Sequence, residues 1–90
     1  MSVKVKLPSI LRKYTDGQEF MEMPVGSPID CLRGLETRFP KIKRWLHDKD
    51  GKLRPQVWFF VNGRRVYEDE LNSVMKDGDE LSILFAIGGG

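Results

Sequence analysis

A single long helical segment, between Ser27 and Pro40, sets the architecture that this chain can adopt. Ser27 is a favourable N-cap and Pro28 suits the first helical position, while Pro40 stops the helix. Apolar residues recur at helical spacing between these ends and predict a buried stripe: Ile29, Leu32, Leu35 and Phe39. Since one helix covers only one face of a sheet, a sheet built by the other segments keeps its second face open.

The other segments have the patterns of β-strands. The predicted strands cover residues 3–7, 18–23, 57–61, 64–66 and 80–85. Asn62-Gly63 is a strong hairpin-turn signal between two of them, and Trp45 and Leu46 suggest a short extra helical turn after the main helix. A chain of 90 residues makes one small domain. We therefore expect an α+β fold, a mixed sheet of about five strands with one main helix on one face.

The last predicted strand runs into three glycines, Gly88, Gly89 and Gly90. Ordering glycine costs much conformational entropy, so we expect a flexible tail over residues 86–90 attached to a folded domain over residues 1–85. The tail is held at its base by a strand, and its tip carries a carboxylate that is ionised at neutral pH. Such a tail can enter a narrow slot and deliver a reactive group. A flexible terminus or a cloning scar explains the glycines equally well at this point.

Strand periodicity divides the large apolar residues between the two faces of the sheet. The residues expected to face the helix are Val57, Phe59, Val61, Leu81, Ile83 and Phe85. Trp58 and Phe60, together with Leu84 of the last strand, then point to the other face. An apolar patch of this kind, beside the root of the tail, marks a protein interface more often than not. Partial cover by the segment 42–53 is the alternative.

The sequence contains no arrangement typical of an enzyme active site. The serines, the acids and His47 lack the spacing of a catalytic triad, and we interpret His47, in a charged loop, as a solvated surface histidine. Cys31 lies beside the apolar stripe and is interpreted as a small buried thiol. A single cysteine excludes an internal disulfide and does not indicate a metal cluster.

The charge is nearly balanced, with 15 basic and 13 acidic residues and a net charge of +2. This balance does not favour nucleic acid or an anionic membrane as a partner. Three short basic clusters are interpreted as solvated charge: Lys41, Lys43 and Arg44; Arg54; and Arg64 with Arg65. No stretch reaches the length of a membrane span. A strand pattern begins directly at the N-terminus, so we expect no signal peptide and a cytoplasmic location.

Taken together, the order of these elements and three short motifs resemble the ubiquitin-like sulfur carriers. The motifs are Val-Asn-Gly at 61–63, Lys-Asp-Gly-Asp-Glu-Leu at 76–81, and the Gly89-Gly90 terminus. The family includes the small subunit of molybdopterin synthase, the thiamine-pathway carrier and the carrier of cysteine biosynthesis. The resemblance implies a ubiquitin-like β-grasp fold. It also implies that the Gly90 carboxylate is adenylated with ATP on an E1-like partner and becomes a thiocarboxylate that donates sulfur, with Gly89 as its companion. Such a protein is a co-substrate rather than an enzyme and binds no cofactor itself.

Within this family, residues 7–12, 14–18 and 51–54 are most similar to the cysteine-biosynthesis type. Related carriers of that type serve secondary metabolism. The chain departs from the family pattern at Phe85, where a proline is expected, and at Gly88, where a bulkier small residue is common. Both departures bear on the identity of the acceptor enzyme.

The resemblance also implies three kinds of partner: an E1-like adenylating and sulfur-transfer enzyme, a cysteine-synthase-like or other acceptor enzyme, and a protease where the tail has to be exposed. The residues expected to bind partners are Trp58, Phe60, Leu84, Phe85, Ile87 and Gly88. Three alternatives stay open. They are the small subunit of molybdopterin synthase, a protein modifier that forms isopeptide bonds through Gly90, and a plain binding module in which the glycines have no role.

Overall fold

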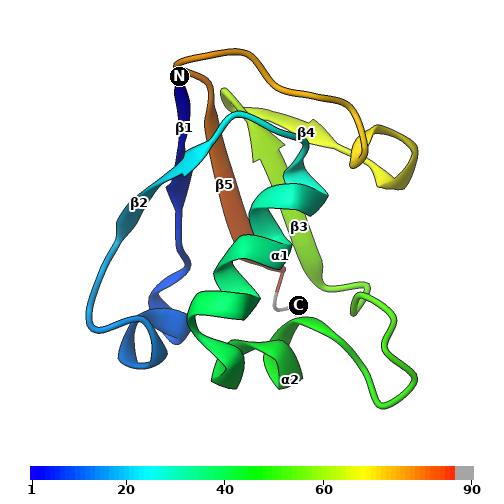
Figure 1. Ribbon diagram of the computed structural model, residues 1–90. Coiled ribbons are helices and arrows are strands. Elements are labelled where there is room, and N and C mark those ends of the chain that lie inside the picture. Colours follow the sequence, from blue (N-terminus) through cyan, green and yellow to red (C-terminus); the bar gives the residue numbers. More distant parts are fainter. Residues whose placement is uncertain (87–90) are drawn as a thin grey trace.

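The computed structural model describes residues 1–86, and residues 87–90 lie outside the described part of the chain. The strands are β1 (Ser2–Lys6), β2 (Phe20–Pro24), β3 (Val57–Val61), β4 (Arg64–Val66) and β5 (Glu80–Phe85). The helices are α1 (Pro28–Arg38) and α2 (Lys43–Leu46), with 3₁₀ turns η1 (Ser9–Tyr14), η2 (Pro40–Ile42) and η3 (Glu68–Glu70). The strands form one mixed sheet in the order β2-β1-β5-β3-β4, in which only β1 and β5 pair in parallel. Helix α1 lies across one face of this sheet (Figure 1), which confirms the expected α+β architecture.

The start of α1 is held by a capping box. The Ser27 hydroxyl accepts a hydrogen bond from the Asp30 backbone N–H at 3.1 Å, and the Asp30 carboxylate accepts one from the Ser27 N–H at 3.0 Å. The bond from the Ser27 backbone is the largest cause that lowers the pKa of Asp30. Farther along α1, a Cβ added to Gly34 would collide with the terminal methyl group of Met23 on β2, so a larger residue there requires this flexible side chain to move.

The core lies between α1 and the sheet, and strand periodicity predicts its sheet side correctly. On β3 and β5, Phe59, Leu81 and Ile83 are at most 2% exposed. Val61 and Phe85, at the strand ends, are partly buried against the same core. The expected inner face of these two strands is therefore confirmed.

Helix α1 buries a slightly different stripe from the one expected. Leu32 and Leu35 are fully buried as predicted, whereas Ile29 and Phe39 are only partly buried. Glu36, a charged residue, takes a buried position instead. Ile29 lies in the first turn of α1 and Phe39 is its C-cap, and both pack against the core while keeping some contact with solvent.

Two differences from the expected elements lie in the first hairpin. The segment after β1, predicted as a loop, forms the turn η1 and buries Leu11 completely. The hydroxyl of Thr15, itself buried, lies within 3.4 Å of the carbonyls of Leu11, Arg12 and Gln18 and closes this turn. The return strand begins at Phe20, two residues later than predicted, because residues 15–19 are used in the turn.

The segment that follows α1 packs on the helix side of the sheet. Ile42 and Leu46 are fully buried in the core that Leu35 shares. Figure 1 shows α2 beside the lower end of α1, on the side where the chain leaves β5. These residues therefore do not cover the outer face of the sheet. The alternative in which the segment 42–53 covers that face is wrong for residues 42–46, which pack on the helix side.

Candidate functional site

Strand β5, from which the tail continues, lies at the centre of the sheet between β1 and β3. Its first residue is anchored by the Asn62-Gly63 turn, where both residues have positive φ as a type I′ hairpin requires. The Asn62 side chain accepts a hydrogen bond from the Glu80 N–H and donates one to Asp79, each 2.9 Å long. Asp79 also accepts from the Lys76 backbone N–H at 2.9 Å, and this bond is the largest cause that lowers its pKa.

The far end of β5 is anchored to the segment before β3. Val57 pairs with Phe85, and the Ala86 N–H donates a 2.7 Å hydrogen bond to the Gln56 carbonyl. The strand is thus held at both ends by hydrogen bonds up to the last described residue. The predicted roles of Ile87, Gly88, Gly89 and Gly90 fall outside the described residues, and the division into a domain over 1–85 and a tail over 86–90 stays a prediction.

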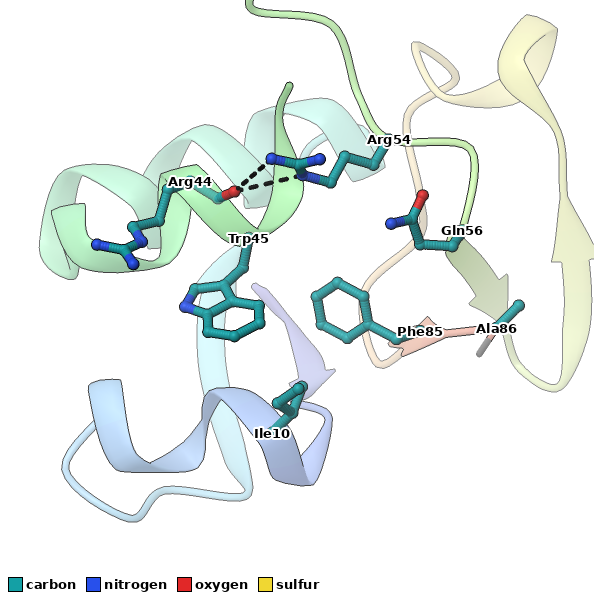
Figure 2. A pocket seen from close by; sticks show the side chains of 7 residues that line it. All are labelled: Ile10, Arg44, Trp45, Arg54, Gln56, Phe85 and Ala86. Carbon is teal, nitrogen blue, oxygen red and sulfur yellow. Dashed lines mark hydrogen bonds between the residues drawn. The ribbon is translucent and has the colours of Figure 1, made fainter. Parts of the chain in front are cut away.

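A pocket of about 650 Å³ opens beside this point, and we call it the tail-root pocket. It is lined by Ile10, Arg44, Trp45, Arg54, Gln56, Phe85 and Ala86. Figure 2 shows the rings of Trp45 and Phe85 on its apolar side and Arg54 with Gln56 on its polar side, whereas the Arg44 side chain extends away from these residues. The Arg54 guanidinium donates through Nε and a terminal nitrogen to the Arg44 carbonyl at 3.3 and 3.1 Å. Because this carbonyl belongs to α2, the two hydrogen bonds tie Arg54 to that helix.

The opposite, outer face of the sheet carries the predicted apolar residues Trp58, Phe60 and Leu84, which we call the outer-face patch. Trp58 pairs directly with Leu84 across β3 and β5, and Leu84 is 42% exposed. Trp58 and Phe60 are half-buried, because they lie among neighbouring side chains of the same face. The structure brings these three residues together on the face away from α1, while their role in binding a partner stays a prediction.

Arginine and lysine side chains contact three of the aromatic rings on this outer face, those of Phe20, Trp58 and Tyr67. The Arg65 guanidinium lies 3.5 Å from the centre of the Trp58 ring and 4.6 Å from that of Tyr67. At the β2 edge, the Lys4 ammonium lies 4.3 Å from the centre of the Phe20 ring. These are cation–π contacts. The interpretation of Arg65 as solvated charge is therefore wrong, since its side chain is stacked and half-buried.

Cys31 is 2% exposed, and burial raises the pKa of its thiol to about 11. A thiol with such a pKa stays protonated near neutral pH and is a poor nucleophile. The interpretation of Cys31 as a small buried thiol is confirmed.

The interpretation of His47 as a solvated residue is wrong. His47 Nε2 lies 2.5 Å from the carboxylate of Glu36, which is 7% exposed, and Nδ1 lies 3.1 Å from the Gly51 carbonyl. The imidazole thus links α1 to the loop after α2. Glu36 and His47 lie on different elements, so no periodic pattern in the sequence signals that they meet.

The described part of the chain contains no group of three or more His, Cys, Asp or Glu residues placed to hold a metal ion. Among residues 1–86, no helix has the length and apolar character needed to cross a membrane.

Comparison with known proteins identifies the class to which this sheet and tail belong. The sulfur carrier protein CysO of Mycobacterium tuberculosis is 33% identical over 93 residues, and the match covers 100% of both chains. A chain in the crystal structure of the BexX/CysO complex from Amycolatopsis orientalis matches with 34% identity and a TM-score of 0.81, over 98% of this chain and 99% of that one. The solution structure of small archaeal modifier protein 1 from Methanosarcina acetivorans matches with 28% identity and a TM-score of 0.84, over 99% and 96%.

These matches confirm the ubiquitin-like β-grasp fold expected from the sequence. The chain belongs to the ThiS family, whose model matches residues 5–90. With the full-length CysO relative, this places it in the class of small sulfur carrier proteins. The family match extends through the glycine tail, beyond the last residue that the structure describes.

Proposed function

We propose that this protein carries sulfur as a thiocarboxylate on Gly90, in cysteine biosynthesis or a related pathway of secondary metabolism. The observation that carries the proposal is the central strand β5. It is anchored at both ends, its last residue and Ala86 line the tail-root pocket, and the sequence continues from Ala86 with Ile87 and three glycines. A firmly held base with a slender glycine end is what an enzyme needs to thread a terminal carboxylate into its active site.

The chemistry requires no side chain of the carrier. The ionised Gly90 carboxylate attacks the α-phosphorus of ATP on an E1-like enzyme, a new C(O)–O–P linkage forms, and pyrophosphate leaves. A hydrosulfide ion supplied by the partner then attacks the carbonyl carbon, the C–O bond to AMP breaks, AMP leaves, and loss of the sulfur-bound proton gives the thiocarboxylate. Adenylation makes the step possible because AMP is a far better leaving group than oxide. The ATP belongs to the activating enzyme, in keeping with a carrier that acts as co-substrate.

Partner binding is assigned in this proposal to the outer-face patch and the tail. Trp58, Phe60 and Leu84 dock the activating enzyme, and Phe85, Ile87 and Gly88 contact it along the route to its active site. The partly exposed apolar surface of the patch, close to the strand that leads into the tail, supports this assignment. The acceptor is a cysteine-synthase-like or other biosynthetic enzyme, and a protease acts first where the tail has to be exposed.

The test is intact-mass spectrometry of the full chain after incubation with the E1-like enzyme, ATP and a sulfide source. We expect the mass increase of one sulfur-for-oxygen exchange at the C-terminus. The matched control carries Gly90 as a primary amide, which removes the nucleophilic oxygen and changes nothing else. Pyrophosphate release at an undiminished rate with the amide would contradict the mechanism.

A second candidate function is protein modification through isopeptide bonds. It is favoured by the similarity to small archaeal modifier protein 1, at 28% identity over nearly the whole chain. The product separates the two functions. A modifier produces a ladder of conjugates on a denaturing gel that survive reducing agents, whereas a carrier produces the free thiocarboxylate.

A further inference from the structure

The charges of this nearly neutral protein are separated toward two ends of the molecule. Residues 38–54 contain seven lysines and arginines and two aspartates, whereas residues 68–80 contain six acidic residues and one lysine. Figure 1 shows α2 and the loop after it near the end of β5 where the chain exits, and the segment after β4 at the other end of the sheet. The tail therefore leaves the protein from its basic end.

The tail-root pocket concentrates this basic character at one place. Arg44 and Arg54 line it, and no acidic residue is among its lining within residues 1–86. Two donors of Arg54 are used by the Arg44 carbonyl, which orients the guanidinium and leaves other N–H groups available. The Arg44 side chain forms no hydrogen bond or ion pair with any described residue, although its backbone carbonyl is used. The Arg54 guanidinium thus lies beside a half-buried apolar wall made by Trp45 and Phe85, while the Arg44 side chain extends away from it at the rim and adds a second positive charge to this end of the molecule.

We propose that the tail-root pocket binds an acidic segment of the enzyme that activates the C-terminus, and this inference rests on the function proposed above. A carboxylate of that segment pairs with Arg54, the nearby positive charge of Arg44 attracts the acidic segment, and a neighbouring apolar side chain packs against Trp45 and Phe85. The contact is separate from the outer-face patch, which lies on the other face of the sheet. This contact lies where β5 ends and the tail begins, so it orients the glycines toward the active site of the enzyme.

The charge separation supports an enzyme segment of negative charge as the occupant. Oppositely charged surfaces steer association and fix the orientation of the encounter, so the basic end reaches an acidic enzyme surface first. A second copy of this chain is the competing occupant, because its own acidic end is complementary. Such a head-to-tail contact produces rings or open chains, and in both the tail root of almost every copy is covered. This arrangement is incompatible with delivery of the tail.

The experiment measures kcat and KM of the activating enzyme for the carrier by ATP–pyrophosphate exchange, at low and at physiological salt. The main variant is Arg44→Glu, whose side chain has no described bond to lose, with Arg54→Gln as a second variant. The matched control is Lys76→Glu, which makes the same change in net charge at the acidic end. We expect Arg44→Glu to raise KM by about tenfold at low salt with kcat unchanged. The difference in KM between this variant and the unaltered protein should become smaller as salt is added. Lys76→Glu is expected to leave KM within about twofold.

Three results would overturn the inference. If Arg44→Glu and Arg54→Gln, shown to be folded by their melting temperatures, have the KM of Lys76→Glu, the pocket does not bind the enzyme while the proposed function stands. If sedimentation at low salt reveals self-association that Arg44→Glu abolishes, the occupant is a second copy. If the unaltered chain supports no pyrophosphate exchange at all, the proposed function fails, and this inference fails with it.

Discussion

A pair of alanine substitutions at adjacent positions of β3 tests whether the inner face of the sheet stabilises the fold and the outer face binds the activating enzyme. Phe59 faces α1, is 2% exposed, and pairs with Val66 on one side and Ile83 on the other. Phe59→Ala should cost about 3–5 kcal/mol, since it removes buried surface and leaves a cavity. In a domain of this size each kcal/mol lowers the melting temperature by roughly 4–8 °C, so the decrease should exceed about 12 °C.

Phe60 is the next residue and points to the outer face, where it is half-buried between Arg65 and Ser82. Because its site is open to water, Phe60→Ala leaves no closed cavity, and about 1 kcal/mol of stability should be lost. Its effect on binding should be larger. An aromatic anchor at an interface typically contributes about 2 kcal/mol or more, so the Kd for the activating enzyme should rise about thirtyfold.

The assay combines thermal unfolding of each variant with titration calorimetry against the activating enzyme. The matched control is Phe20→Ala, which removes another phenylalanine of the outer face, 39% exposed and on the edge strand β2, which β1 separates from β5. Phe20→Ala should change neither the melting temperature nor the Kd for the activating enzyme by much. If Phe60→Ala binds as tightly as the unaltered protein, the outer-face patch does not dock the enzyme. If Phe60→Ala unfolds as readily as Phe59→Ala, the energetic distinction between the two faces is wrong.

Three further predictions concern the tail, the contact between Glu36 of α1 and His47, and the buried thiol of Cys31. Deletion of residues 89–90 should abolish sulfur transfer and leave the melting temperature unchanged, because glycines bury little surface. A melting temperature lower by several degrees, or continued delivery of sulfide, would contradict the proposed role of the tail. His47→Ala should cost about 1–3 kcal/mol in urea unfolding by leaving the buried Glu36 carboxylate without its partner, and the double variant with Glu36→Gln should recover part of this loss. The Cys31 thiol has its pKa raised from 9.0 to about 11 by burial, so the native protein should react slowly with Ellman's reagent at pH 8 and rapidly once unfolded. The thiol ionises at a lower pH in the unfolded chain than in the folded protein, so the free energy of unfolding should decrease as pH rises from about 9 through 11. A reaction rate of the native protein equal to that of the unfolded chain would refute the burial argument.

Much of the fold is predictable because the signals that define it are local. The N-cap at Ser27 determines where the main helix begins, and Pro40 determines where it ends. The period of two in residues 57–61 decides which side chains of β3 face the helix. Asn62-Gly63 specifies a turn whose positive φ angles few other residue pairs adopt, and the structure has that turn.

Other features depend on residues that are far apart in the sequence, and no local pattern predicts them. The parallel pairing of β1 with β5 places the tail-bearing strand at the centre of the sheet. Glu36 is a poor candidate for burial until His47, eleven positions away, supplies a partner for its carboxylate. Arg65 appears as one more surface charge in the sequence, but the neighbouring ring of Trp58 on β3 stacks beneath it.

The amino-acid sequence alone was enough to predict an α+β fold, because the capped helix and the period-two strands are each recognisable within a few residues. The class of protein came from a resemblance of the whole chain to the sulfur carriers, which the family match then showed. Tertiary structure alone decided the surroundings of the tail. The chain brings η1, α2, the segment before β3 and the end of β5 together, and only that assembly creates a pocket with Arg44 and Arg54 beside Trp45 and Phe85. The physical reason is that helix and strand signals arise from hydrogen bonds and periodicity between near neighbours, whereas a pocket is the space left where distant segments pack.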